Sequence, residues 1–371
     1  MKQTSHIDWI LFSAILPILG VGLLTMDSFG ANNGHFDRQL IWIVISIAVF
    51  FALSFIDFNF LKRTPVVATL FGLAVLLLTM LFVVGHISKG AESWFSLGGV
   101  SFEPADPVKL ILIIVLAKYF SRRHVEIAHF SHLVVSGVYA LILFFLVLLQ
   151  PDFGGALVIF LIWLGLVLVS GISKKHIAAV FGVGALAFLL LWVGVLHPYQ
   201  KQRIETFLHP LADVRGAGYN AYQSTITVGS GQLLGKGLGY GTQSRLRFLP
   251  EYQTDFVFAA FAEEWGFVGV ILVLILYSIV IWRILANAMR GAGNFEMLFG
   301  IGLALFICIH FFVNVGMNIG LLPVTGINVP FMSYGGTYLL TVFTGLGILM
   351  GMRRYAQVAH KNVMDNEFLG L

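Results

Sequence analysis

The chain has 371 residues, of which 58% are hydrophobic and only 11% are charged, and its formal net charge is +4. A soluble domain carries roughly 25% charged residues, so this chain cannot cover a water-facing surface and requires lipid as its solvent. The basic residues lie at the ends of apolar runs rather than in one cluster, which argues against nucleic acid as a partner. The single cysteine, Cys308, excludes a disulfide or a cysteine metal site within one chain.

Apolar runs of spanning length follow one another along the chain and predict an all-α, polytopic membrane protein with about ten transmembrane helices. Residues 1–371 are expected to form a single integral membrane domain. The fourth run is the weakest candidate, because it is short and holds Lys109 and Lys118. The first run lacks a small-residue cleavage site after it and is interpreted as an uncleaved anchor. The expected spans are 8–26, 39–56, 65–84, 107–120, 133–149, 155–172, 176–195, 256–285, 297–318 and 336–352.

Lysine and arginine in the short loops predict the orientation, because cytoplasmic loops are enriched in both. With ten spans, the more basic set of loops and both termini are expected in the cytoplasm. The opposite loops include 85–106, the turn 150–154 and a long connection over about residues 197–254, between the seventh and eighth spans. A connection of that length is predicted to bind or catalyse. The basic loops carry Lys62-Arg63, Arg122-Arg123, Lys174-Lys175, Arg290 and Arg353-Arg354.

Charged residues gather at the outer ends of several spans, where their cost in lipid makes them functional candidates. Asp106 and Lys109 stand three apart and would share a helix face, either as a structural ion pair or as part of a site. Asp152, after a proline, is either a site residue or a helix-start acid that suits the helix dipole. Glu251 and Asp255, at the start of the eighth span, carry the same two interpretations.

Two adjacent acids lie deeper in the eighth span. Glu263 and Glu264 cannot both be helix-start acids, so at least one is expected to face a cavity or a basic partner. His310, in the ninth span, is expected to be a buried histidine with its hydrogen bonds satisfied. Ser333 opens the last span after a loop with proline and glycine, where a broken backbone could line a cavity.

The long connection contains two basic features that could meet phosphate. Lys236 is flanked by Gly235 and Gly237, and glycine lets a backbone approach a ligand closely, although a flexible loop without a ligand is the alternative. Gly237 replaces the Ser or Thr of a Walker loop, so no nucleotide site is predicted. Arg203, beside Tyr199, could clamp a diphosphate or anchor the chain at the lipid headgroups. Composition and spacing do not decide between an enzyme and a transporter.

The order of several segments resembles the SEDS family (shape, elongation, division and sporulation), and more closely its RodA branch than its FtsW branch. Each segment alone is weak, but the ordered set is specific and covers about residues 87–336. The family's usual Pro-Ser-Glu is Pro104-Ala-Asp106 here, which shortens that acid by one methylene. The matching segments include Ser88-Lys-Gly-Ala91, Phe102-Glu-Pro-Ala-Asp106 with Lys109, Gln150-Pro-Asp152-Phe-Gly154, Tyr199-Gln with Arg203, Gly229-Ser-Gly231, Gly235-Lys-Gly237, Gly241-Thr-Gln-Ser244, Leu249-Pro-Glu251 with Thr254-Asp-Phe256, Val313-Asn with Gly316-Met317 and Ser333-Tyr-Gly-Gly336.

The resemblance implies an inverting, processive peptidoglycan glycosyltransferase in elongation and rod shape. It would polymerise lipid II on the outer face of the bacterial cytoplasmic membrane and release undecaprenyl diphosphate. The resemblance implies Asp255 as the catalytic base. The basic groups that it implies for the diphosphate are Lys109, Arg203 and Lys236. The remaining candidates are Glu251, Asp152 and Ser333 for substrate binding, and Asp106 and Glu263 as structural or cavity residues.

The implied partners are lipid II, the undecaprenyl-diphosphate-linked glycan, membrane lipid, a class B penicillin-binding protein and the elongation machinery. A divalent cation, Mg or Mn, could assist beside Asp152 or Glu251, but the sequence indicates no metal site. Two alternatives from other functional classes stay open. One is a flippase that moves lipid II without breaking a bond, and the other is a scaffold that only positions a penicillin-binding protein.

Overall fold

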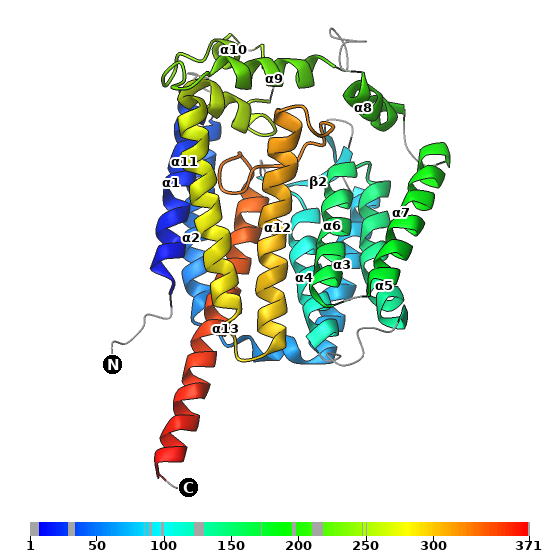
Figure 1. The fold of residues 1–371 in the computed structure, drawn as a ribbon, viewed down its shortest axis with the longest axis vertical. Coiled ribbons are helices and arrows are strands. Elements are labelled where there is room, and N and C mark those ends of the chain that lie inside the picture. The colour runs from blue at the N-terminus through cyan, green and yellow to red at the C-terminus, as the bar shows by residue number, and fades with distance from the viewer. Residues whose placement is uncertain are drawn as a thin grey trace.

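Helices dominate the computed structural model. It describes residues 7–28, 34–84, 86–88, 91–97, 100–121, 130–171, 173–194, 198–209, 218–246, 248–249 and 251–369. Within this part of the chain, long helices form a bundle and three shorter ones lie across one of its ends (Figure 1). The bundle consists of α1 (Trp9–Asp27), α2 (His35–Ser54), α3 (Thr64–Val84), α4 (Ala105–Ser121), α5 (Phe130–Leu149), α6 (Phe153–Val169), α7 (Lys174–Gly194), α11 (Val257–Ala288), α12 (Asn294–Asn318) and α13 (Gly336–Leu369).

Each bundle helix covers one of the expected spans, which confirms the polytopic helical fold. Helices α1, α2, α3, α5, α11 and α12 are each long and apolar enough to cross a membrane. The last helix begins at Gly336 as expected but continues to Leu369, beyond the predicted end at 352. Its final part projects from the bundle (Figure 1).

The weakest predicted span, α4, lies in the middle of the bundle. It packs against α3, α6 and α12, and Leu112, Ile113 and Leu116 are fully buried. A helix surrounded by protein needs no lipid-facing apolar surface, so it can be short and carry charge. The same charges that weakened the prediction therefore lie inside the protein rather than in lipid.

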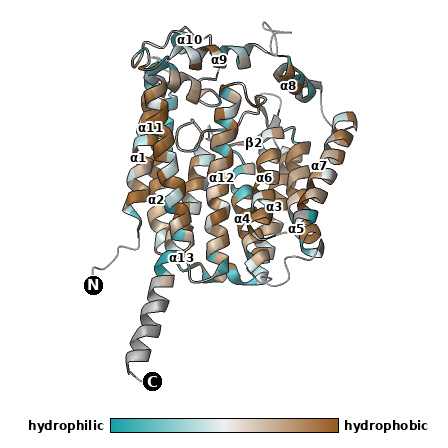
Figure 2. Ribbon diagram, viewed as in Figure 1, coloured by the Kyte–Doolittle hydropathy of each residue, from teal (hydrophilic) through white to brown (hydrophobic). Residues whose placement is uncertain are grey.

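The connection between α7 and α11 contains three helices among its described residues. It contains α8 (Pro198–Leu208), α9 (Tyr219–Ser230) and α10 (Thr242–Arg245), which lie at one end of the bundle (Figure 1). The start of α1 and the end of α13 lie at the opposite end, as an even number of spans requires. Figure 2 shows a mainly hydrophobic bundle with hydrophilic residues concentrated towards its two ends, the pattern expected of a membrane-spanning protein.

A small antiparallel sheet between α3 and α4 was not predicted. Its strands are β1 (His86–Ser88), β2 (Ala91–Leu97) and β3 (Val100–Phe102), in the order β1-β2-β3. Phe95 pairs with Phe102 and packs against the hydrophobic core. Directly after the sheet, the Glu103 backbone N–H donates to Thr337 Oγ1 at 3.3 Å, which joins this segment to the start of α13.

Helix α11 is broken at Gly266, whose φ of 65° lies in the left-handed region. The break frees backbone groups, and the segment 232–237 satisfies them. Lys236 N donates to Glu263 O at 2.9 Å, and Phe267 N donates to Gln232 O at 2.9 Å. A methyl group at Gly266 would lie 2.2 Å from Gly235 N. The glycines around Lys236 therefore let one backbone approach another, rather than a ligand.

A buried acid joins the first helix to two late helices at the end of the bundle where the chain begins. The Asp8 carboxylate caps α1 through Ile10 N and Leu11 N, at 3.2 and 3.1 Å. The same group accepts hydrogen bonds from Arg283 and Asn287, both at 2.7 Å. Arg353 of α13 lies 3.7 Å away. A buried carboxylate is stable because cations and amides surround it.

Candidate functional site

Asp255, the predicted base, lies in the turn directly before α11 and is half-buried. Its backbone carbonyl accepts hydrogen bonds from Asn314 Nδ2 at 2.9 Å and from Asn318 Nδ2 at 3.1 Å. A methyl group at Gly326 would lie 3.7 Å from Asp255 Oδ2, so the carboxylate lies beside the connection between α12 and α13. The main chain of Asp255 is thus held independently of its side chain.

The two asparagines belong to a polar face of α12 that the sequence analysis did not single out. Both are fully buried. Asn318 Nδ2 also donates to Asn314 Oδ1 at 2.9 Å, while Asn318 Oδ1 accepts from Ala259 N at 3.2 Å and lies 3.2 Å from Ser224 Oγ. A buried amide is stable only when its groups are bonded, so this network fixes one geometry. The available signal was a pair of amides four residues apart inside an apolar run.

Ser333, predicted to bind substrate, contacts the residue next to Asp255. Its hydroxyl donates to Thr254 O at 2.6 Å and accepts from Val329 N at 2.8 Å. Its carbonyl accepts from Gln39 Nε2 of α2 at 3.2 Å. Since a hydroxyl has one proton, and Thr254 already receives it, Ser333 positions the turn that carries Asp255. Direct substrate contact by Ser333 stays a prediction.

Asp106 and Lys109 form the expected ion pair at the start of α4. Lys109 Nζ lies 2.9 Å from Asp106 Oδ1, and each residue is only 3% exposed. Asp152 is the N-cap of α6, where its carboxylate accepts from Gly155 N at 2.8 Å. The helix-start interpretation of Asp152 is therefore correct, and it does not exclude a further role. The ion-pair interpretation of Asp106 and Lys109 is likewise correct at the level of geometry.

Glu103 is a further acid at this end of the bundle, and it was not a candidate. Burial raises the pKa of the Glu103 carboxyl well above its usual value. The charge of Asp106 raises this pKa further and Lys109 opposes it, while Asp152 and Asp255 add smaller increases. Asp255 and Asp152 are therefore both within electrostatic reach of Glu103, and Asp152 is also within reach of the α4 pair. Segments far apart in the sequence meet here in one acidic group with a buried lysine.

Glu251 is exposed and shapes the turn before α11. Its φ of 51° lies in the left-handed region, and its carboxylate accepts from Thr254 Oγ1 at 3.1 Å. Its backbone carbonyl accepts from Phe256 N at 3.2 Å. These contacts close the turn that contains Asp255. A substrate contact by Glu251 stays a prediction.

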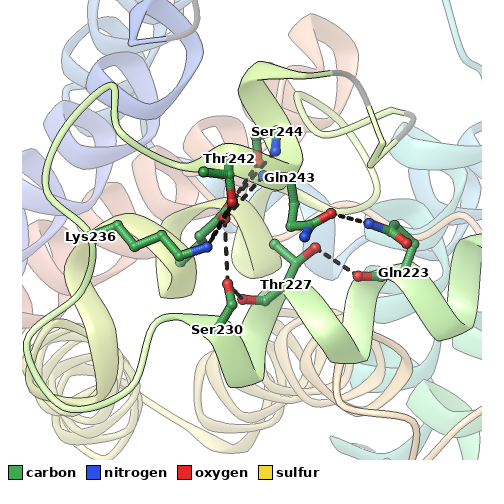
Figure 3. Close-up of polar contacts among 8 residues, drawn as sticks. Gln223, Thr227, Ser230, Lys236, Thr242, Gln243 and Ser244 are labelled. Carbon is green, nitrogen blue, oxygen red and sulfur yellow. Dashed lines mark hydrogen bonds and ion pairs between the residues drawn. The ribbon is translucent and has the colours of Figure 1, made fainter.

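Lys236 points towards Thr242 of α10 (Figure 3) and forms an ion pair with Glu263 of α11. Lys236 Nζ lies 2.7 Å from Glu263 Oε1, and the Glu263 side chain is fully buried. A basic partner was one of the two environments predicted for at least one of the adjacent acids, and Glu263 has it. Arg203 lies in α8, at the same end of the bundle, but its side chain is outside the described residues.

His310 was expected to have its hydrogen bonds satisfied, and only one ring nitrogen has a partner. The ring stacks on Tyr338 at 4.5 Å between centroids, and Nδ1 lies 3.4 Å from Asn328 O. Within the described residues, His310 Nε2 and Tyr338 Oη have no hydrogen-bond partner. Nor does the described part of the chain gather three or more His, Cys, Asp or Glu side chains for a metal.

Comparison with known proteins places the chain in a family. The FtsW/RodA/SpoVE model, described as a cell cycle protein, matches residues 5–358. The chain belongs to this family. Peptidoglycan glycosyltransferase MrdB of Escherichia coli K12 is 35% identical over 363 residues, or 96% of each chain. Stage V sporulation protein E of Bacillus subtilis 168 is 32% identical, over 96% of this chain and 99% of its own length.

Solved structures agree with this assignment. A chain of a peptidoglycan synthase complex that coordinates polymerization and crosslinking is 30% identical, with a TM-score of 0.81 over 94% of this chain and 98% of that chain. The rod shape determining protein RodA of Thermus thermophilus is 30% identical, with a TM-score of 0.70 over 94% of this chain and 96% of that one. The predicted resemblance to RodA is confirmed, and the chain is a bacterial membrane protein.

Proposed function

We propose that this chain is a RodA-type peptidoglycan glycosyltransferase that polymerises lipid II at the outer face of the cytoplasmic membrane. The observation that carries the proposal is the position of Asp255. Asn314 and Asn318 hold its main chain, and Glu103 lies within electrostatic reach of both Asp255 and the buried lysine of α4. A fixed carboxylate and a basic group at one end of the bundle are what glycosyl transfer from a lipid diphosphate requires. Relatives over nearly the whole chain carry the name of this activity.

Asp255 acts as the general base of the proposed reaction. The acceptor 4-hydroxyl attacks the anomeric carbon of the donor, and its proton passes to the Asp255 carboxylate. A new glycosidic C–O bond forms while the bond between the anomeric carbon and the diphosphate oxygen breaks, with inversion at that carbon. Undecaprenyl diphosphate leaves with the bonding electron pair. Because a diphosphate is already a good leaving group, a single carboxylate can suffice.

Lys109 is the described residue best placed to meet the leaving diphosphate. Its ammonium has three N–H groups, and Asp106 accepts one of them. The surrounding acids, Glu103, Asp106 and Asp152, outnumber this lysine, so binding of an anion needs further positive charge. Arg203 is the proposed source from the outer connection. A divalent cation beside Asp152 or Glu251 remains a second proposal.

We infer that residues 1–371 form one integral membrane domain with both termini in the cytoplasm. Helices from the two halves of the chain pack together, α2 on α13 and α1 on α11. The cap of α8, α9 and α10 lies at the end opposite the end of α13 (Figure 1). The basic loops at Lys62-Arg63 and Arg353-Arg354 set the direction.

Reporter fusions test this orientation. A fusion after Ser173 is expected to report the cytoplasm, and a fusion after Lys236 the opposite side. A periplasmic alkaline phosphatase and a cytoplasmic fluorescent protein give complementary signals at each position. The same compartment for both positions would contradict the ten-span topology.

A gel assay of purified protein with lipid II tests the proposed activity. Glycan polymer and free undecaprenyl diphosphate are expected in stoichiometric amounts, in detergent and in vesicles. The flippase alternative predicts transport of lipid II across vesicles with no polymer. The scaffold alternative predicts neither product from this chain, with or without a partner.

A class B penicillin-binding protein is the proposed partner, because glycan strands need crosslinking. The support is the related chain in a peptidoglycan synthase complex that coordinates polymerization and crosslinking. The same gel assay is therefore run with and without that partner. Faster polymerisation with the partner supports activation, whereas a full rate from the isolated chain would show that the partner is not needed for it.

A further inference from the structure

The Glu263 carboxylate joins three segments of the outer cap to α11, and Figure 3 shows its partners Ser230, Lys236 and Thr242. Its Oε1 accepts from Lys236 Nζ at 2.7 Å, from Gln243 N at 3.0 Å and from Thr242 Oγ1 at 3.2 Å. Ser230 Oγ, at the end of α9, lies 3.4 Å from the same oxygen, and the Ser244 N–H and hydroxyl lie 3.4 Å from Oε2. One side chain of α11 thus holds α9, α10 and the glycine-rich segment between them.

The two members of the ion pair differ in their access to water. The Glu263 side chain is fully buried, whereas the Lys236 side chain is 29% exposed. Removing the lysine leaves an uncompensated charge inside the protein, which is costly. Removing the carboxylate leaves a lysine that water can solvate, and a glutamine in its place still accepts hydrogen bonds. Loss of Lys236 is therefore expected to disturb the cap more than loss of the Glu263 charge.

The cap is also joined to the carboxylate that the reaction uses. Glu263 lies eight residues beyond Asp255, about two helical turns along α11. In the middle of α9, Ser224 Oγ donates to Asn318 O at 3.0 Å, and Asn318 holds the Asp255 carbonyl. Helix α9 therefore connects the Lys236–Glu263 ion pair to Asn318, which holds the main chain of Asp255. The first turns of α11 lie between these two attachments.

We propose that Lys236 acts on the reaction through Glu263, and that this pair is a positioning element for the start of α11 and Asp255. The Lys236 ammonium then serves as the counter-charge of Glu263 and is not a ligand of the diphosphate. Its bonds to Glu263 Oε1 and to Thr242 Oγ1, at 2.7 and 2.8 Å, hold it against the cap. This inference rests on the proposed glycosyl transfer and replaces the phosphate-binding role predicted for Lys236.

A double-mutant cycle in the full-length protein separates the two roles. Lys236→Met alone is expected to lower kcat for lipid II polymerisation on the order of 10²-fold with little change in KM, because the base is displaced. In a Glu263→Gln background, the same substitution should cost less than about 2-fold, because no buried charge remains to be neutralised. An equal loss in both backgrounds, or a loss confined to KM, would overturn the proposal.

Hydrogen exchange supplies a structural readout that does not depend on activity. Backbone amides of residues 257–262 should exchange faster in Lys236→Met and return towards the wild-type rate in the double variant. If Lys236→Met fails to fold, Thr242→Val replaces it in both arms, since it removes one bond to each member of the pair. Unchanged exchange in Lys236→Met, or in Thr242→Val where it takes the place of Lys236→Met, contradicts the positioning role. Absence of polymer from the wild-type protein would instead contradict the proposed function and leave the exchange result interpretable.

Discussion

Asp255→Asn is expected to lower lipid II polymerisation by about 10²–10⁴-fold, the usual cost of losing a general base. The amide keeps the shape of the carboxylate but cannot take the hydroxyl proton. Folding should be unaffected, because Asn314 and Asn318 hold the Asp255 backbone carbonyl rather than its side chain. The measurement is single-turnover release of undecaprenyl diphosphate, together with binding of lipid II.

Two further variants sharpen this test. Asp27→Asn is the matched control, since Asp27 is an exposed acid at the end of α1, and it should polymerise at the wild-type rate. Asp255→Glu should also be slow. The main chain at this position is held in place, so one extra methylene moves the carboxylate away from the position that the reaction needs. Wild-type polymerisation by Asp255→Asn would remove Asp255 from the mechanism and restore the flippase and scaffold alternatives.

Lys109→Met is expected to lower the free energy of unfolding by roughly 3–5 kcal/mol, because it leaves Asp106 charged and unpaired inside the protein. Combining it with Asp106→Asn removes both charges and should recover most of that loss. Thermal unfolding in detergent measures the recovery. Lys118→Met, at the other end of the same helix, is the control for replacing a lysine in α4. It removes the hydrogen bond to Lys62 O and leaves the Asp106–Lys109 pair in place.

The double variant decides what the ion pair does. If Lys109 meets the diphosphate, Asp106→Asn with Lys109→Met should fold and yet polymerise on the order of 10²-fold more slowly than the wild type. This is the expected result. A folded double variant with wild-type activity would instead show that the pair is purely structural. Donor binding distinguishes the two results independently, since loss of a phosphate ligand weakens it.

The spans, their order and the family followed from the sequence alone. Hydrophobicity is a local property in a membrane protein, because lipid surrounds each span and no partner segment is needed to reveal it. The segment around Asp255 could likewise be recognised from the sequence, because the resemblance depends only on the order of residues along the chain. Even the weakest span, α4, began within two residues of its predicted start.

The contacts that position the site could not be predicted in the same way. Lys236 and Glu263 are 27 residues apart, and the Ser224 and Asn318 pair is separated by 94. The first of these pairs lies beside the break in α11 at Gly266, where the segment that contains Lys236 supplies the hydrogen bonds that the helix loses. The glycines beside Lys236 correctly indicated a close approach of the backbone. The sequence could not indicate that the neighbouring group is the backbone of α11.

Sequence by itself determined that lipid is the solvent, where the chain crosses it and which acids and bases lie near the ends of the spans. Tertiary structure decided which of them act together. It paired Lys109 with Asp106 and Lys236 with Glu263, and it directed two amides of α12 to the main chain of Asp255. The physical reason is that hydropathy acts residue by residue, whereas a buried charge or amide is stable only with a partner, and the fold alone brings that partner near.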